Sequence, residues 1–139
     1  DVCSSDLPGR FAAHMMYSPN LSTAIYGGAD LFLMPSISEP CGLSQMIAMR
    51  YGTIPVVRET GGLRDSVVPY NKFTGEGTGF SFANINVQEM TGVLSEAVNL
   101  YHNEPKAWKA LQKNAMTADF SWEKSAKAYE EIYGWVTGK

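Results

Sequence analysis

The sequence predicts an α/β fold: a Rossmann-like, doubly wound parallel sheet with carboxy-terminal helices. Two short apolar runs, Leu31–Met34 and Thr53–Val57, have no polar face. Such runs are typical of strands that are covered on both sides in a parallel sheet. A segment with helical spacing follows each run, and this alternation implies right-handed crossovers between parallel strands. Three further helical segments follow toward the end of the chain.

The region before these runs is predicted to contain one strand and one helix. Phe11–Tyr17 is an apolar run of strand length. Ser18 suits the cap of a helix and Pro19 its first turn. Apolar residues continue the helical spacing over Leu21–Tyr26, and the following glycine pair, Gly27–Gly28, ends the helix.

The remaining elements follow from spacing and from breaker residues. They are expected in this order: a helix over about residues 42–51 that ends at Gly52, a turn at Gly61–Gly62, a short helix at Leu63–Val68, a loop at Pro69–Thr78, a strand at Gly79–Phe82, and helices at about Val87–His102, Glu104–Thr117 and Ser121–Val136. About four strands are therefore visible, which is few for a doubly wound sheet. We expect the missing edge to lie upstream, in a longer protein.

Composition narrows the function classes. Hydrophobic residues make up 45% of the 139 residues, which is ordinary for a folded domain. The net charge of -3 argues against a nucleic-acid partner, because phosphate backbones are bound by basic surfaces. No apolar run reaches the roughly 20 residues of a membrane helix. The two cysteines, Cys3 and Cys41, lack metal-ligand spacing, and so few cysteines favour a reducing, cytoplasmic compartment.

The chain divides into three expected parts. Residues 1–7 show no strand or helix period and no initiator methionine, so they are interpreted as a non-native or disordered segment. Residues 8–118 form a Rossmann-like ligand-binding domain that is incomplete at its amino-terminal side. Residues 119–139 form a terminal helix that begins near Ser121, a good cap residue.

The candidate ligand site follows the Leu31–Met34 strand. In open parallel sheets, ligands bind outside the carboxyl ends of the strands. The next helix is expected to begin near Cys41–Gly42, and a helix amino terminus offers free N–H groups and about half a positive charge, which suit a phosphate. Gly42 lets the backbone approach closely, and Ser44 adds a hydroxyl donor.

Glu39 lies beside this phosphate site and needs a different explanation. A carboxylate repels a phosphate, but it is a strong acceptor for sugar hydroxyls, because charge-assisted hydrogen bonds are about twice as strong as neutral ones. Glu39 therefore fits a sugar phosphate or a nucleotide-sugar. On the residues alone, a solvated loop acid near a helix start explains Glu39 equally well.

Several segments together resemble bacterial glycogen synthases and plant starch synthases. They are Ala29–Ser36, Glu39–Gln45, Tyr51–Arg58 and Glu59–Ser66, with Phe120–Trp122, Ala126 and Tyr129 in the terminal helix. The resemblance spans about residues 8–139. It implies the GT-B architecture, in which two Rossmann-like domains face a cleft, and transfer of glucose from ADP-glucose to the non-reducing end of an α-1,4-glucan with retention, without metal or organic cofactor.

The resemblance also implies partners. The chain would supply the donor-binding half, and its terminal helix would cross to the missing amino-terminal domain. The Arg and Lys residues that neutralise the diphosphate in this family lie upstream, and Arg58 and Arg64 match neither position. The chain alone is therefore expected to be inactive. The alternatives are a non-catalytic nucleotide-sugar-binding module and a UDP-sugar-dependent GT-B transferase.

Roles carry over to the residues that match the family motif. The resemblance implies that Glu39 binds the donor glucose hydroxyls and places the anomeric carbon. It implies that Cys41, Gly42 and Leu43 give backbone N–H contacts to the sugar and the diphosphate, and that Ser44 contacts the phosphate.

Further contacts are implied around this motif. Tyr17, at a strand exit, would lie against the adenine, and Thr60, Gly61 and Gly62 would line the cleft. Two departures are visible. Met16 stands where many members have Gly, and Ile47 stands where related GT-B transferases carry a second Glu for the ribose, which leaves the ribose contact unassigned.

Three residues could suggest nucleophilic chemistry. Cys41 would need a base, and no histidine stands near it in sequence, so we interpret it as a small residue fitted close to the ligand. His14, in the predicted first strand, and His102, near a helix end, are interpreted as structural.

Late aromatic residues could stack on sugars or pack in the core. At helical spacing, packing is the commoner role. The residues concerned are Trp108, Trp122, Tyr129, Tyr133 and Trp135. Without the partner domain, some of these rings would be exposed.

Overall fold

The computed structural model describes residues 9–138, and the expectation for residues 1–7 lies outside that range. In the described part the elements are, in order, α1 (Pro19–Gly28), β1 (Leu31–Met34), α2 (Ser44–Tyr51), β2 (Ile54–Arg58), α3 (Gly62–Ser66), β3 (Phe80–Phe82), α4 (Val87–Asn103), α5 (Pro105–Thr117) and α6 (Trp122–Thr137). The predicted α/β class is confirmed.

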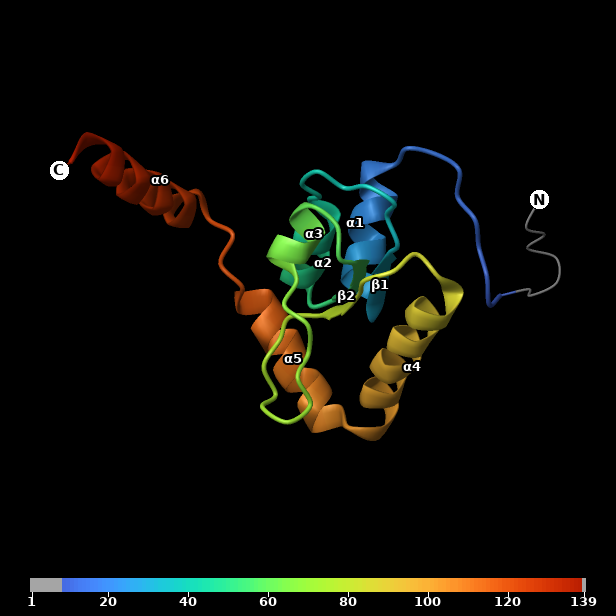
Figure 1. The fold of residues 1–139 in the computed structure, drawn as a ribbon. Helices are drawn as coiled ribbons and strands as arrows, with labels where there is room; N and C mark the ends of the chain where they lie inside the picture. Colours follow the sequence, from blue (N-terminus) through green and yellow to red (C-terminus); the bar gives the residue numbers. More distant parts are fainter. Residues whose placement is uncertain (1–8, 139) are drawn as a thin grey trace.

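The three strands form one parallel sheet in the order β1-β2-β3 (Figure 1). In this register Leu31 pairs with Ile54, and Val56 pairs with Phe80. Within the described residues β1 pairs with β2 alone, so the outer edge of β1 is open. The carboxyl ends of the strands therefore lie side by side at one edge of the sheet.

Helices cover both faces of this short sheet. Met49 of α2 packs in one core with Leu100 of α4 and Leu111 of α5. In Figure 1, α4 and α5 form the lower part of the molecule, below α1, α2 and α3. Neighbouring side chains of β2 point to opposite faces of the sheet. Ile54 and Val56 pack in the larger hydrophobic core, which includes Trp108 and Leu111 of α5. Val57 lies on the other face and packs against Leu63 of α3. This alternation is the period of two of a β-strand, and every residue from Ile54 to Val57 is buried as the sequence predicts.

Helix ends follow the predicted cap residues. The Ser18 side chain accepts a hydrogen bond from the Leu21 N–H, and Pro19 stands in the first turn of α1. Gly52 ends α2 in the left-handed conformation, with φ 84°. Thr53 then donates its hydroxyl to the carbonyl oxygens of Tyr26 (2.6 Å) and Ala29 (2.8 Å), which ties the end of α1 to the start of β2.

The predicted strand at Phe11–Tyr17 is wrong. These residues are exposed and irregular, and the sheet has three strands in the described chain rather than about four. A β-strand persists only when its backbone pairs with a neighbour, and this segment pairs with none of the described strands. His14 therefore lies in irregular chain rather than in a strand.

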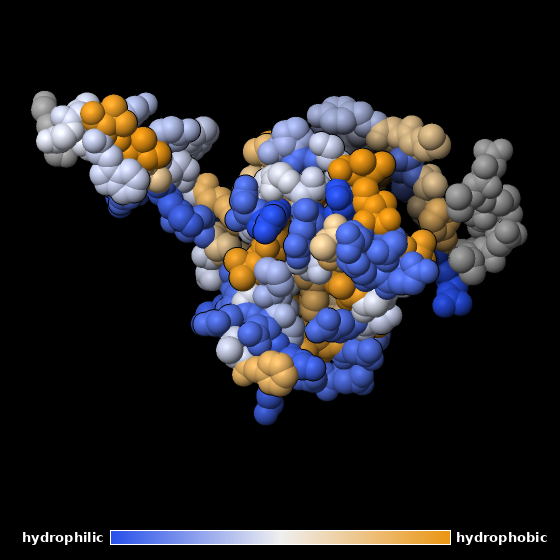
Figure 2. Space-filling model, viewed as in Figure 1, coloured by the Kyte–Doolittle hydropathy of each residue, from blue (hydrophilic) through white to orange (hydrophobic). Residues whose placement is uncertain are grey.

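The aromatic residues divide between core and surface. Trp108 is 4% exposed, packed edge-on against Tyr101 with ring centroids 5.1 Å apart, so its predicted core role is confirmed. The rings of α6 do not pack in the core of this chain, and their exposure agrees with the expectation that some rings are uncovered without the partner domain. The exposed rings are Trp122, Tyr129, Tyr133 and Trp135. Figure 1 shows α6 standing away from the sheet and its helices, and Figure 2 shows apolar residues gathered on it.

None of the helices in the described part of the chain combines the length and the apolar character that a bilayer span requires.

Candidate functional site

Two loops meet at the carboxyl edge of the sheet. The β1–α2 loop covers residues 35–43 and contains Glu39, and the β2–α3 loop covers residues 59–61. The Gly62 N–H, at the start of α3, donates to the Pro40 carbonyl oxygen at 3.3 Å. The motif segments Glu39–Leu43 and Thr60–Gly62 are therefore neighbours in the fold, although the bonded residues Pro40 and Gly62 are 22 positions apart in sequence.

The glycine pair makes this contact possible. An ideal Cβ placed on Gly61 would overlap the Glu39 carbonyl oxygen, and one placed on Gly62 would overlap the carbonyl oxygen of Cys41. Gly61 also has φ 46° and ψ -136°, a conformation that side chains disfavour. The backbones of the two loops thus touch directly, and larger residues at these two positions would separate them.

The helix amino terminus is displaced from its predicted position. α2 begins at Ser44 rather than near Gly42, and Leu43 is its cap residue, with φ -108° and ψ -28°. The first helical hydrogen bond runs from the Ile47 N–H to the Leu43 carbonyl oxygen at 3.0 Å. Gly42 has φ 74°, so the chain turns in a left-handed conformation immediately before the helix, which shortens the helix at that end.

Glu39 is half-buried in the β1–α2 loop. Within the described residues its carboxylate forms no ion pair. Cys41 is a free, exposed cysteine two residues later. The loop that carries the Glu39 carboxylate leads into the amino terminus of α2, whose first N–H groups lack partners within the helix.

Tyr17 is the predicted site residue that the structure places differently. It lies on the irregular segment before Ser18 and is 93% exposed, so it does not stand at a strand exit. Thr60 is half-buried and its N–H donates to the Arg58 carbonyl oxygen at 2.9 Å, within the β2–α3 loop.

The Arg58 side chain hydrogen-bonds to the backbone of the β1–α2 loop. Its guanidinium Nη1 donates to the carbonyl oxygens of Ile37 (2.8 Å) and Ser36 (3.3 Å). The last residue of β2 therefore holds the first half of the neighbouring loop.

Gln45 and Ser66 are site residues that the sequence reasoning missed. Gln45 is fully buried under Gly42 and hydrogen-bonds both to the β1–α2 loop and to Ser66 of α3. The helical spacing could have identified Gln45. It stands three and four residues before Ala48 and Met49, the buried apolar residues of α2, so a polar side chain occupies the buried face of that helix.

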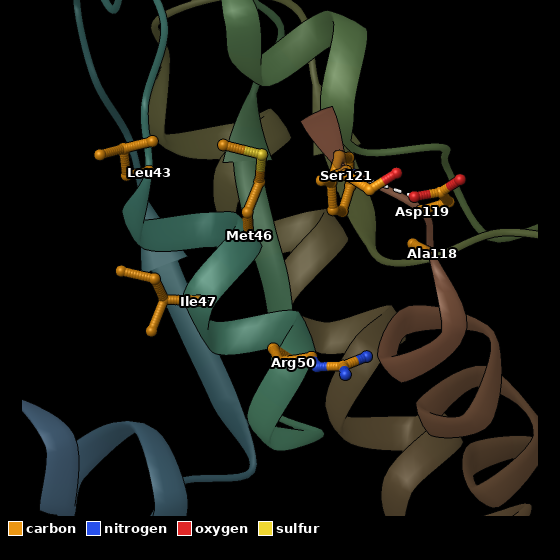
Figure 3. Close-up of a pocket in the computed structure, with 8 residues that line it drawn as sticks. Leu43, Met46, Ile47, Arg50, Ala118, Asp119 and Ser121 are labelled. Atoms are coloured by element: carbon orange, nitrogen blue, oxygen red, sulfur yellow. Dashed lines mark hydrogen bonds between the residues drawn. The ribbon is translucent and has the colours of Figure 1, made fainter. Parts of the chain in front are cut away.

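A hollow of about 540 Å³ lies beside the loops, between the outer face of α2 and the α5–α6 connection (Figure 3). Leu43 and Ile47 of α2 line it, and Arg50 reaches across to the Met116 carbonyl oxygen at the end of α5, at 3.1 Å. Ile47 thus faces an apolar hollow. Within residues 9–138 no three His, Cys, Asp or Glu side chains gather into a candidate metal centre.

Comparison with known proteins shows the family of this chain. Residues 13–117 match the model of the family "Glycosyl transferases group 1". A glycogen synthase of Fusobacterium nucleatum is 56% identical to this chain over 125 residues, which cover 90% of the chain and 27% of the relative. The chain spans about a quarter of the length of the curated relatives it matches.

Two solved structures are similar to the described fold. The catalytic domain of starch synthase IV from Arabidopsis thaliana, bound to ADP and acarbose, superimposes with a TM-score of 0.77 at 44% identity, over 89% of this chain and 26% of that one. Sucrose-phosphate synthase from Thermosynechococcus elongatus shares the fold, with a TM-score of 0.67 at 23% identity over 96% of this chain and 32% of that one.

Proposed function

The chain belongs to the group 1 glycosyl transferases, and we propose that it is the donor-binding part of a glycogen or starch synthase. This enzyme transfers glucose from ADP-glucose to the non-reducing end of an α-1,4-glucan. Relatives named glycogen synthase, at 50–56% identity, support the proposal. So does the similarity to a starch synthase domain that was solved with ADP and acarbose.

The single observation that carries the proposal is the contact between the β1–α2 and β2–α3 loops. The β1–α2 loop in this contact carries the half-buried Glu39 five residues before the start of α2, and within the described residues its carboxylate forms no ion pair. A nucleotide-sugar has the matching parts, hydroxyls next to a diphosphate. Glu39 accepts hydrogen bonds from the glucose hydroxyls and places the anomeric carbon.

The diphosphate lies against the backbone. The N–H groups of Cys41, Gly42 and Leu43 and the Ser44 hydroxyl bind the diphosphate and the sugar, and the positive end of α2 favours the charge that develops on the departing ADP. Catalysis is then mainly positioning plus electrostatic stabilisation.

The walls of the site complete the donor pocket. Thr60, Gly61 and Gly62 line the cleft from the β2–α3 loop. The exposed ring of Tyr17 is free to lie against the adenine.

The rest of the machinery comes from outside this chain. Residues 8–118 are the donor domain, and residues 119–139 cross to an amino-terminal domain, whose surface covers the exposed rings of α6. That domain supplies the acceptor site, and the upstream residues supply the cations that neutralise the diphosphate. The 139-residue chain alone is therefore inactive. The enzyme works in the cytoplasm, where the exposed Cys41 thiol stays reduced.

The test uses the full-length protein that contains this chain. Transfer of labelled glucose from ADP-glucose to glycogen is measured for the wild type, for Glu39→Gln and for Glu76→Gln, which alters an exposed acid of the 69–78 loop. Hydrogen bonds to a charged group contribute roughly 1.5–3 kcal/mol, so Glu39→Gln lowers kcat/KM at least about tenfold. Glu76→Gln leaves it unchanged.

Calorimetric titration assigns the part of the donor that Glu39 binds. Glu39→Gln weakens ADP-glucose binding more than ADP binding, because ADP lacks the sugar. Equal loss for both ligands would contradict a sugar contact for Glu39. If the wild-type protein bound UDP-glucose in preference to ADP-glucose, ADP-glucose would not be the donor. If it bound ADP-glucose but transferred no glucose, the protein would be a nucleotide-sugar-binding module.

A further inference from the structure

Gln45 occupies an unusual place for a polar side chain. Its relative exposure is 0%, and its amide packs under Gly42, where an ideal Cβ would stand 2.6 Å from its Oε1. Among the described residues Oε1 has no hydrogen-bond partner. An unpaired buried acceptor is unfavourable, and an apolar side chain of the same size would avoid it. The amide nitrogen must therefore account for the presence of glutamine here.

The amide nitrogen links the two loops of the candidate site. Nε2 of Gln45 donates to the Gly42 carbonyl oxygen at 2.9 Å and to Ser66 Oγ at 2.9 Å. Ser66 Oγ in turn donates to the Gly62 carbonyl oxygen at 2.6 Å. A chain of three hydrogen bonds thus runs from the β1–α2 loop, through the interior, to the start of α3.

This link fixes the orientation of one peptide group. The Gly42 carbonyl points inward, because its partner Nε2 belongs to a fully buried side chain. In a trans peptide the C=O and the following N–H point in opposite directions, so the Leu43 N–H points outward. Among the described residues no acceptor is recorded for this N–H. Flipping this peptide would change ψ of Gly42, which a glycine tolerates, but it would also turn Leu43 from φ -108° to a positive φ, which a leucine disfavours. The Gln45 link and the backbone of Leu43 therefore favour the same orientation.

We propose that Gln45, supported by Ser66, is a positioning residue that holds the Gly42–Leu43 peptide with its N–H toward the donor diphosphate. The role rests on the proposed function. In the opposite orientation the Gly42 carbonyl would face the diphosphate and repel the charge that develops when ADP departs. Gln45 touches no substrate and acts through this peptide alone.

The test uses the full-length protein and compares Gln45, in the first turn of α2, with Gln112 of α5, whose side chain reaches the other end of α2. Gln45→Met removes the link with little change of size. Gln112→Met is the matched control, because Gln112 Nε2 also donates to a glycine carbonyl, that of Gly52 at 2.9 Å, but at the carboxyl end of α2. Removing one donor to developing charge lowers kcat by about a hundredfold or more, so Gln45→Met shows that loss with a smaller change of KM. Gln112→Met keeps kcat.

A second variant changes Ser66. Because Ser66 is only half-buried, its replacement is less disruptive to folding than replacement of Gln45. Ser66→Ala lowers kcat, and Ser66→Thr, which keeps the hydroxyl, retains more activity than Ser66→Ala. The double variant Gln45→Met with Ser66→Ala loses no more than Gln45→Met alone, because the two side chains act as one link.

A crystal structure of Gln45→Met separates this proposal from the proposed function. A Gly42 carbonyl that still points inward would overturn the positioning role, whatever the enzyme transfers. Equal kcat values for Gln45→Met and Gln112→Met would also overturn it. A flipped peptide in a protein whose wild type transfers no glucose would support the positioning role and refute the synthase assignment.

Discussion

Replacing Gly61 with alanine tests the direct backbone contact between the two loops. Alanine must adopt φ 46° and ψ -136°, which strains the backbone by about 1–3 kcal/mol. Its Cβ also overlaps the Glu39 carbonyl oxygen, and overpacking of this kind costs about 1–3 kcal/mol more. Gly61→Ala therefore lowers the free energy of unfolding by roughly 2–6 kcal/mol.

Urea unfolding of the 139-residue chain measures this loss, with Gly92→Ala as control. Gly92 lies within α4, where an added Cβ meets nothing within 4 Å. Alanine there raises the free energy of unfolding by about 0.5–1 kcal/mol, because it restricts the unfolded chain and favours helix. A loss below about 1 kcal/mol for Gly61→Ala would refute the proposed contact, since strain alone exceeds that amount. In the full-length protein the same variant pushes the β1–α2 loop outward and weakens donor binding.

Two further predictions concern stability. Trp108→Ala lowers the free energy of unfolding by about 3–5 kcal/mol, because it leaves a cavity in the core. The control Trp122→Ala, at a ring that is 90% exposed, changes the free energy of unfolding by about 0.5 kcal/mol or less. Equal losses for the two variants in urea unfolding would contradict the core position of Trp108. Hydrogen bonds from the Asn84 N–H and side chain, and then from Asn86, lower the pKa of Glu89. The ionised form therefore stabilises the fold above the unfolded-state pKa of about 4.3, and this stability disappears as the pH falls through the lowered value. Urea midpoints of the wild type should drop between about pH 6 and about pH 3 more than those of Glu89→Gln, and equal drops would show that Glu89 contributes nothing.

The sequence was informative where one residue type decides the local backbone. Ser18 with Pro19 marks the start of α1, and Gly52 marks the end of α2, because each has a backbone or capping property that few other residues share. The apolar run at Thr53–Val57 predicted the central strand, since only a strand covered on both sides is apolar throughout.

The sequence misled where an element depends on distant partners. Phe11–Tyr17 has strand composition, but composition cannot supply the neighbouring strand whose hydrogen bonds it requires. Spacing likewise could not show that Gln45 and Ser66, 21 residues apart, share a hydrogen bond. The β1–α2 motif was predicted because Glu39 and Gly42 form an uncommon combination near a helix start. Its supporting residues Gln45 and Ser66 are of common types, and nothing in their spacing marks them.

The open edge of β1 has a practical consequence for the isolated chain. Within residues 9–138, the outer edge of Leu31–Met34 is a row of backbone groups without a strand partner, and such an edge readily recruits a strand from another molecule. Expressed alone, the chain is therefore prone to self-association and precipitation at high concentration. A charged residue in place of the exposed Leu33 would make this edge less attractive to another strand and keep the protein monodisperse.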